Sequence, residues 1–344
     1  MYLHALSTAV PPESYTQMQC WDITDRSSVR SRLNRRSSLI LHSILRGDHG
    51  IATRHFAVAN VERIFDQTSD ELNAAFRTHG PKLASRALTD ALAKAGLRVE
   101  EVDALLICTC TGYLCPGLTS YVAEQLGLRD NVFLQDLVGL GCGAAIPTLR
   151  AVSQITAANP NAVVACVAVE ICSAAFYLDD DPGVLISACL FSDGAAATIW
   201  RGTPGATSLR AFDFNTVHLP ADRDKLRFEQ RDGKLRNLLD RSVPELAARA
   251  VSRLWRERGD RPVSRVVAHP GGRDVLEALS PVVAPHALTA SAETLREHGN
   301  MSSPSVLFAL QRTLETTQPD GDGDFWLVSF GAGFSAHSCR IGSA

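Results

Sequence analysis

The stretch Phe133-Leu-Gln-Asp-Leu-Val-Gly-Leu-Gly-Cys142-Gly-Ala-Ala145 decides how this chain folds. Its first half is an apolar run of strand length, and the glycines around Cys142 then form a turn. A helix-forming run from Ala144 to Ala158 follows, so the pattern predicts a strand, a tight turn and a helix. A cysteine in this position stands at a helix N-terminus, where the macrodipole and unpaired backbone N–H groups favour thiolate over thiol. We therefore consider Cys142 a candidate nucleophile.

Two further polar residues stand in apolar, glycine-bounded surroundings. His269 ends the run Val-Val-Ala and precedes Pro-Gly-Gly, and Asn300 lies in the run His-Gly-Asn-Met-Ser-Ser. A cysteine, a histidine and an asparagine together form a constellation for acyl transfer. Each also has a purely structural interpretation, because buried cysteines, turn histidines and helix-capping asparagines are common. Their joint occurrence favours a catalytic site.

The composition is that of a globular enzyme. The 344 residues are 45% hydrophobic and 21% charged, and the net charge of −3 gives no reason to expect nucleic acid as a partner. No apolar segment reaches about 18 residues, so no membrane span is expected. The nine cysteines form no secreted disulfide pattern, and the N-terminus lacks a signal peptide. These features predict a protein of the reducing cytoplasm.

Two patterns resemble ligand sites only weakly. Cys108-Thr-Cys110 with Cys115 has a loose zinc spacing, and no histidine lies nearby. Gly331-Ala-Gly333 follows a strand near the C-terminus, but the acidic residue that would bind a ribose does not follow it. We expect neither a metal nor a cofactor.

Strands and helices alternate along the chain, which predicts an α/β protein built in layers. The predicted strands are 2–10, 102–109, 131–138, 162–169, 195–200, 263–268 and 325–330. The predicted helices are 69–95, 119–126, 144–158, 243–258, 273–279 and 304–316, with Ser69 or Asp70 capping the first and Ser303 the last. A break at Gly202-Thr-Pro-Gly205 predicts two parts, residues 1–205 and 206–344.

In this order and spacing, the motifs of the chain resemble those of the thiolase-fold condensing enzymes, and among them the type III polyketide synthases, which are chalcone synthase-like. The matching segments are Leu105-Leu-Ile-Cys-Thr-Cys-Thr-Gly112, Pro116-Gly117, Gly141-Cys-Gly-Ala144, Glu170-Ile171, Leu190-Phe-Ser-Asp-Gly194, Ala268-His-Pro-Gly-Gly272, Gly299-Asn-Met-Ser-Ser303 and Phe330-Gly-Ala-Gly333. The resemblance implies two similar halves in an αβαβα arrangement. The first half carries the cysteine, and the second half carries the histidine and the asparagine.

The same resemblance implies roles for individual residues. Cys142 accepts the acyl group, while His269 and Asn300 stabilise the enolate that forms when a malonyl thioester loses carbon dioxide. The residues implied around the cavity are Phe191 as the gatekeeper of the access tunnel, Cys110, Cys172, Ala175, Ser302, and Cys115, which reaches towards the cavity of a partner subunit. The second gatekeeper of plant members falls near residues 235–237, where this chain has Leu-Arg-Asn.

Small or apolar residues at Cys110, Cys172 and Ala175 fit an aliphatic starter and resemble bacterial members. The resemblance therefore implies an acyltransferase of the bacterial alkylresorcinol or alkylpyrone type. It would load a fatty acyl starter on Cys142, extend it with malonyl-CoA, and close an alkylresorcinol, a resorcylic acid or an α-pyrone. The alternatives are a malonyl-only synthase of the tetrahydroxynaphthalene type, a β-ketoacyl-carrier-protein synthase III, and a catalytically silent subunit that only binds acyl chains.

The resemblance also implies partners. The starter is expected on coenzyme A or on an acyl carrier protein, and the chain is expected to form a homodimer. The basic cluster that binds coenzyme A phosphates in plant members would lie near residues 41–48, where it is altered here. An acidic carrier protein would instead dock on an arginine-rich segment made of Arg30, Arg32, Arg35, Arg36 and Arg46.

Overall fold

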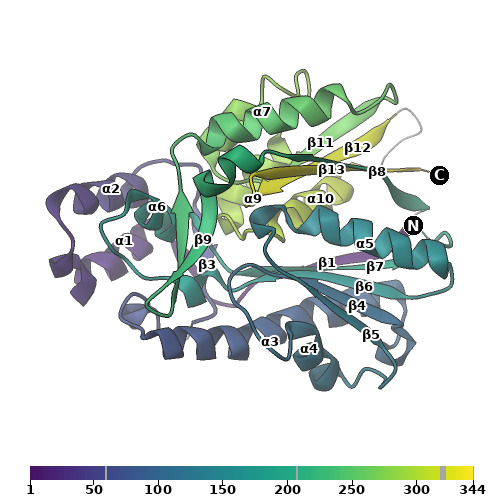
Figure 1. Cartoon of the computed structure of the whole chain (residues 1–344), viewed down its shortest axis with the longest axis horizontal. Helices are drawn as coiled ribbons and strands as arrows, with labels where there is room; N and C mark the ends of the chain where they lie inside the picture. Colours follow the sequence, from purple (N-terminus) through teal and green to yellow (C-terminus); the bar gives the residue numbers. More distant parts are fainter. Residues whose placement is uncertain (59, 207, 318–322, 344) are drawn as a thin grey trace.

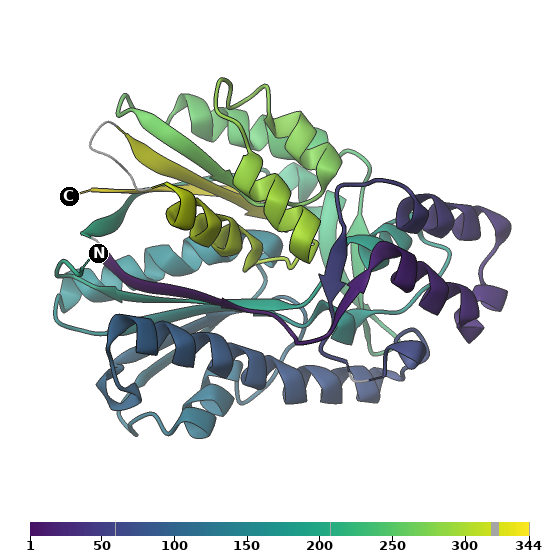
Figure 2. The same ribbon diagram turned by 180° about the vertical axis from the view of Figure 1, so that it is seen from behind.

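The computed structural model describes residues 1–58, 60–206, 208–317 and 323–343, and it has the layered α/β architecture expected from the sequence. Its large sheet has nine strands in the order β11-β12-β13-β8-β1-β7-β6-β4-β5. β8 and β1 share the single register pair Tyr2↔Arg210, and the first four strands fold over the other five at this point (Figure 1). Helices lie between the two layers of strands and on both outer faces, which gives the five layers αβαβα (Figures 1 and 2).

The lower strands in Figure 1 belong to the first half of the chain. They are β1 (Tyr2–Ala9), β4 (Ala104–Cys108), β5 (Phe133–Leu137), β6 (Val164–Glu170) and β7 (Gly194–Arg201). In β4, Leu106 and Cys108 pack in the core between the two layers of strands, whereas Leu105 and Ile107 pack under the outer helices. This alternation follows from the pleat of a strand, and parallel strands covered on both faces are apolar on both.

The upper strands belong to the second half of the chain. They are β8 (Leu209–His218), β11 (Val263–Ala268), β12 (Asp324–Gly331) and β13 (Ser335–Ser343). β11 and β12 run parallel, and β12 pairs antiparallel with β13. The same alternation holds in β12, because Phe325 and Leu327 belong to the inner core whereas Trp326 and Val328 belong to the outer one.

Two helices fill the inner layer, and their N-terminal halves are the most deeply buried. They are α5 (Ala145–Ala158) and α10 (Ser305–Thr316). The consecutive buried residues from Val306 to Leu310 explain why this segment is apolar without a polar stripe. The outer helices are α3 (Ser69–Ala95) and α4 (Leu118–Leu126) below, with α7 (Val243–Arg256) and α8 (Arg273–Leu279) above, and α9 (Thr289–His298) packs beside α10.

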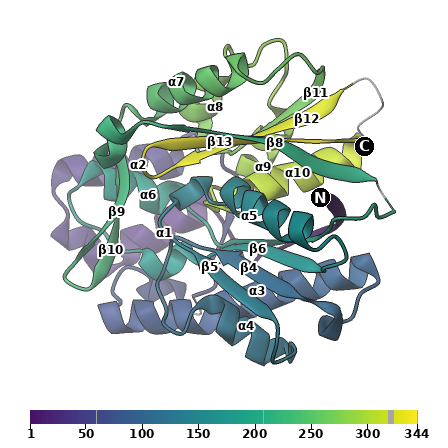
Figure 3. The same cartoon turned by 45° about the vertical axis from the view of Figure 1, so that its right-hand side comes forward.

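A further group of elements lies beyond one end of the sheets, at the left of Figures 1 and 3. It comprises β2 (Ser14–Thr16), α1 (Gln17–Arg26), α2 (Arg35–Arg46), β3 (Thr53–His55), α6 (Pro182–Leu190), β9 (Leu226–Arg231) and β10 (Lys234–Leu239). The core of this group includes Cys142, Cys172 and Phe191. It therefore covers the region in which the sequence predicts the site. No helix in the described ranges is long and apolar enough to cross a bilayer.

The predicted strands and helices are all present, with bounds within two residues of the prediction. The sequence patterns did not predict β2, α1, α2, β3, α6, β8, the β9–β10 hairpin, α9 or β13. Two predicted caps are wrong. Thr68 caps α3 by accepting a hydrogen bond from the Glu71 backbone, and Ser303 donates its hydroxyl to Glu170 instead of capping α10. The division at residue 205 stays a prediction.

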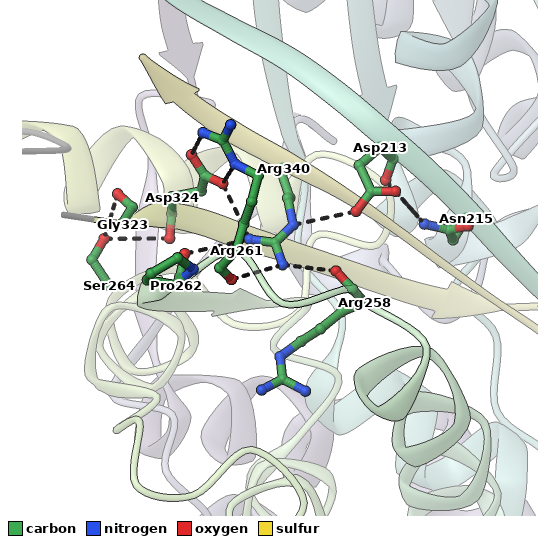
Figure 4. Close-up of polar contacts among 9 residues, drawn as sticks. All are labelled: Asp213, Asn215, Arg258, Arg261, Pro262, Ser264, Gly323, Asp324 and Arg340. Carbon is green, nitrogen blue, oxygen red and sulfur yellow. Dashed lines mark hydrogen bonds and ion pairs between the residues drawn. The ribbon is translucent and has the colours of Figure 1, made fainter. Parts of the chain in front are cut away.

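A buried ion cluster holds the N-terminal end of β12 in place. Arg340 is 1% exposed, and its guanidinium lies 3.1 Å from the Asp324 carboxylate and 3.2 Å from that of Asp213. Arg261 also donates two hydrogen bonds to Asp324, at 2.9 and 3.0 Å (Figure 4). The backbone carbonyls of Arg258 and Arg261 accept from the remaining Arg340 nitrogen. The cluster thus joins β12 and β13 to the segment before β11.

Replacing Asp324 by alanine should lower the free energy of unfolding by about 3 kcal/mol or more, because Arg340 would stay buried without its main partner. Urea denaturation followed by fluorescence measures this change. Glu257→Ala is the control, since its pair with Arg253 is more than half exposed on both sides and should contribute less than about 1 kcal/mol. Equal effects of the two variants would contradict a structural role for the cluster.

Candidate active site

Cys142 lies in a tight turn between β5 and α5. Residues Gly141–Gly143 form a single 3-10 turn, and Gly141 has a φ of +57°, which favours glycine. The turn packs against the end of β12, where a Cβ on Gly331 would come within 2.6 Å of the Gly143 nitrogen. This close contact accounts for a glycine at position 331 without any nucleotide. The Cys142 side chain is 7% exposed.

Ser302 is the direct polar neighbour of Cys142. Its hydroxyl donates to the Cys142 Sγ over 3.1 Å and also lies 3.1 Å from the Sγ of Cys110. Ser302 has a φ of +61°, a left-handed conformation that costs about 1–3 kcal/mol for a residue other than glycine. The Asn300 side chain offsets part of this strain, because its Oδ1 accepts the Ser302 backbone N–H at 2.8 Å.

Asn300 is held by hydrogen bonds from both its side chain and its backbone. Its Nδ2 donates to the Gly271 carbonyl over 3.0 Å, which leaves one of the two amide hydrogens for another acceptor. Its backbone forms an isolated bridge to Phe191, with hydrogen bonds to the Leu190 carbonyl at 3.0 Å and from the Ser192 nitrogen at 2.9 Å. The bridge joins Phe191, the expected gatekeeper, to Asn300, the expected hydrogen-bond donor to the enolate.

His269 directly follows β11 and is 1% exposed. Its backbone nitrogen donates to the Val328 carbonyl, and its ring meets the Phe330 ring edge-on with 5.2 Å between centroids. Its Nδ1 is buried and has no hydrogen-bond partner within the described residues. Burial lowers the pKa of His269 to about 3, so the imidazole is neutral in the substrate-free chain.

The three predicted catalytic residues are linked through hydrogen bonds to intervening residues and not through hydrogen bonds to one another. Cys142 contacts Ser302, whose backbone is held by Asn300, and Asn300 contacts Gly271 two residues after His269. Within the described residues, no hydrogen bond joins Cys142 to Asn300 or to His269. The geometry thus brings the three segments together, and the catalytic roles stay predictions.

Burial also sets the protonation state of Cys142. Removal from water raises the pKa of its thiol to about 12, the hydrogen bond from Ser302 lowers that pKa in part, and the charge of Glu170 raises it again. The sequence analysis expects a thiolate stabilised by the helix N-terminus. In the substrate-free chain the cost of burying a charge exceeds that effect, because the turn encloses the sulfur.

Two cavities of very different size adjoin in this region, since Thr111 and Phe228 line both of them. A cavity of about 580 Å³ reaches Cys110 and Gly141 and is bounded by α3 and the β9–β10 hairpin. A second cavity of about 20 Å³ is lined by Phe191, Cys172 and Ala175, and has room for about one water molecule. Cys142 itself lines neither cavity, but Gly141 precedes it in the chain and Cys110 shares the Ser302 hydroxyl with it.

The remaining predicted residues divide into two groups. In the segment expected to carry a second gatekeeper, Leu235 lines the large cavity and Asn237 the small one, while Arg236 is buried against three carboxylates. Cys115 is exposed and lines neither cavity. Its predicted role concerns a partner subunit and stays a prediction.

Sequence reasoning missed Arg54 as a site residue. It is 2% exposed, and its Nη1 donates to the carbonyls of Ala188 at 2.6 Å and Phe191 at 3.1 Å. Its stem packs on Gly299, and its guanidinium lies 5.0 Å from the Phe56 ring centroid. Arg54 therefore supports the Phe191 end of the bridge to Asn300. No sequence motif around it distinguishes it from the many exposed arginines.

Iodoacetamide should alkylate Cys142 far more slowly in the native protein than in the urea-unfolded protein at pH ~8, because burial raises the pKa of this thiol. The rate should continue to rise up to about pH 10, since the thiolate fraction grows tenfold per pH unit below the pKa. Timed quenching and peptide mass spectrometry measure both. Ser302→Ala should slow the reaction further. A rate that levels off below pH ~7 would mean that the thiolate already exists in the free chain.

Two family models together match most of the chain. Residues 13–217 match the model "FAE1/Type III polyketide synthase-like protein", and residues 230–341 match "Chalcone and stilbene synthases, C-terminal domain". These matches cover the segments that carry Cys142, His269 and Asn300.

Individual relatives agree with the models. The chain is 29% identical to 1,3,6,8-tetrahydroxynaphthalene synthase of Streptomyces peucetius subsp. caesius, over 96% of this chain and 90% of the relative. It is 28% identical to 3,5-dihydroxyphenylacetyl-CoA synthase of Streptomyces toyocaensis, over 98% of this chain and 88% of the relative. The crystal structure of tetrahydroxynaphthalene synthase from Streptomyces coelicolor A3(2) superposes with a TM-score of 0.89 at 26% identity, covering 100% of both chains. The chain therefore belongs to the type III polyketide synthases, enzymes that transfer acyl groups by decarboxylative condensation.

Proposed function

We propose that this synthase primes Cys142 with a malonyl unit, extends it with further malonyl-CoA, and closes a polyhydroxylated aromatic product. The observation that carries the proposal is the difference between the cavities. The 580 Å³ cavity reaches Cys110 and Gly141, whereas the apolar space beside Phe191 holds about one water molecule. The proposal departs from the fatty acyl starter favoured by the sequence, because the space beside Phe191, Cys172 and Ala175 is too small for an alkyl chain.

The names of the relatives support the same choice. Tetrahydroxynaphthalene, dihydroxyphenylacetyl-CoA and phloroglucinol, the products named for three groups of relatives, are hydroxylated aromatics without a long alkyl chain. The match to phloroglucinol synthase of Pseudomonas fluorescens is 25% identical over 74% of this chain. The large cavity of about 580 Å³ has room for an aromatic product of this size.

Loading requires a thiolate at Cys142. We propose that the proton moves from the Cys142 Sγ to His269 as the thioester binds. Burial disfavours each charged form alone, but the resulting ion pair has no net charge, so attraction offsets part of the desolvation. The thiolate then attacks the thioester carbonyl, a new C–S bond forms, and coenzyme A leaves as a thiolate that takes up a proton.

Extension requires stabilisation of an enolate. Loss of carbon dioxide from a second malonyl-CoA leaves negative charge on the thioester oxygen. The free amide hydrogen of Asn300 and an N–H of the His269 ring would donate to that oxygen, each contributing about a hundredfold or more in rate. The enolate carbon then attacks the Cys142 thioester and releases the Cys142 thiolate. Phe191 would exclude water from the departing carboxylate.

Delivery of malonyl and acyl groups is proposed to use the arginine-rich segment. Arg30 and Arg32 form ion pairs with Asp25 and Asp66. Arg35, Arg36 and Arg46 have no carboxylate partner within the described residues, and Leu39 on the same helix is 60% exposed. Exposed, unpaired arginines around an apolar side chain would suit coenzyme A phosphates or an acidic carrier protein.

A cytoplasmic homodimer is the proposed assembly. The edge strand β5 and its neighbouring loops expose large apolar side chains, with Phe133 at 53%, Val138 at 51% and Tyr113 at 71%. An exposed edge strand with apolar side chains is usually covered by a partner. Cys115 lies close in sequence to Tyr113, so pairing along this edge would bring it near the partner, as the family resemblance implies.

Asn300→Asp should lower kcat by about a hundredfold or more, because a carboxylate would repel the enolate that the amide stabilises. Cys142→Gln should abolish condensation and leave decarboxylation of malonyl-CoA measurable. Product formation and carbon dioxide release measure both. Asn161→Asp makes the same change at an exposed turn and should behave as the wild type. Normal turnover by Asn300→Asp would remove Asn300 from this role, and an inactive wild type would favour the silent acyl-binding subunit.

Labelled malonyl-CoA alone should give an aromatic product, and added fatty acyl-CoA should not enter it. Liquid chromatography with mass detection identifies the products. The apolar space beside Phe191 holds about one water molecule, so an alkyl tail would have to enter the large cavity, where it would desolvate Arg227 and Lys234. Products that form only when a fatty acyl-CoA is added would overturn the malonyl starter and restore the fatty acyl one.

A further inference from the structure

The large cavity has a charge pattern that decarboxylative condensation does not explain. Cys110 and Gly141 line one part of it, and residues of the β9–β10 hairpin line another. The charged residues that line it are Arg227 and Lys234, both on that hairpin. Among the described residues, no aspartate or glutamate lines the cavity. A neutral acyl chain carries no charge that could pair with these two cations.

The two cations differ in how far they are neutralised. The Arg227 guanidinium lies 3.2 Å from the Glu229 carboxylate and donates to the Asp224 carbonyl at 2.5 Å. Lys234 has no carboxylate partner within the described residues, and its Nζ lies 5.4 Å from the Tyr177 ring centroid. Its side chain is only partly exposed. An anion that entered the cavity would therefore meet an ammonium group that no carboxylate among the described residues neutralises.

We propose that Lys234, with help from Arg227, binds the free carboxylate of a malonyl starter and thereby selects malonyl over neutral acyl groups. This inference rests on the proposed function, and it identifies the two cations that would distinguish a malonyl starter from other acyl groups. When malonyl-CoA loads Cys142, a thioester bond forms to Sγ and coenzyme A leaves. The carboxylate stays at the other end of the malonyl group. A neutral starter has no such group.

The direction of chain growth brings this carboxylate towards the hairpin. Each extension inserts a two-carbon unit at the thioester end, so the starter end moves away from Cys142 into the large cavity. An ion pair with Lys234 would hold that end in place. It would also keep the starter carboxylate ionised and distant from Asn300 and His269, where carbon dioxide is lost.

The same cations would also suit the phosphates of coenzyme A, and the experiment separates these sources. The Lys234→Met variant is compared with Lys234→Arg, which keeps the charge. Lys225→Met is the matched control, because Lys225 precedes the same hairpin, pairs with Asp240 and lines neither cavity described above. Each protein receives malonyl-CoA alone and malonyl-CoA with isotopically labelled acetyl-CoA, a neutral starter without a tail, and melting temperatures confirm that the variants fold.

In Lys234→Met, malonyl-primed product should fall by about tenfold or more, because a charge-assisted hydrogen bond is lost. Acetyl-primed product should persist, with KM for acetyl-CoA within about twofold of the wild type, since a neutral starter makes no contact with the cation. Lys234→Arg should keep most of the malonyl priming. An equal loss for both starters would assign Lys234 to coenzyme A phosphates and overturn the inference. Unchanged malonyl priming in Lys234→Met would also overturn it, while a wild type that never primes with malonyl-CoA would instead refute the proposed function.

Discussion

The buried carboxylate of Glu170 is the interaction on which the rest of the site depends. It is 0% exposed and accepts five hydrogen bonds, from the Thr109 hydroxyl, the Cys110 nitrogen, the nitrogen and hydroxyl of Thr111, and the Ser303 hydroxyl. The first four come from the loop after β4 in the first half, and the last comes from the segment before α10 in the second half. The Glu170 side chain therefore holds Cys110 and also Ser303, which follows Ser302 in the chain. Cys110 and Ser302 meet beside the Cys142 sulfur.

Because this network is buried, the charged forms of the groups in the site are unfavourable. Removal from water raises the pKa of Glu170, while its hydrogen-bond donors lower that pKa. The thiol of Cys142 and the imidazole of His269 are both held neutral by the same exclusion of water. Charge is therefore created during the reaction rather than stored before it. A site of this kind protects its nucleophile from oxidation and alkylation until a thioester occupies the cavity.

The sequence predicts the layers well because they rest on local patterns. β11, α3 and α8 have their predicted bounds, since apolar periodicity and glycine or proline boundaries act over a few residues. The β9–β10 hairpin was missed because charged residues interrupt its apolar pattern and because distant segments hold it in place. Arg236, for example, forms ion pairs with Asp179 and Asp181, which lie more than fifty positions away.

The candidate site shows the same division between local and long-range information. Its motifs mark Cys142, His269 and Asn300, but the contacts of Ser302 span 160 residues to Cys142 and 192 to Cys110. Cavity volume is likewise a result of packing, so the space beside Phe191 could not be read from Cys172 and Ala175. The small size of those two side chains suggested a wide aliphatic cavity, whereas neighbouring Phe228 and Phe176 fill it.

The central claim is that Cys142 carries the growing chain from a malonyl starter. Mass spectrometry of peptides after brief incubation with malonyl-CoA tests it most directly. The account predicts a malonyl-derived acyl adduct on the peptide that contains Cys142, absent from the same peptide in Cys142→Ala, which should form no product. An adduct on another cysteine, together with product formation by Cys142→Ala, would contradict it.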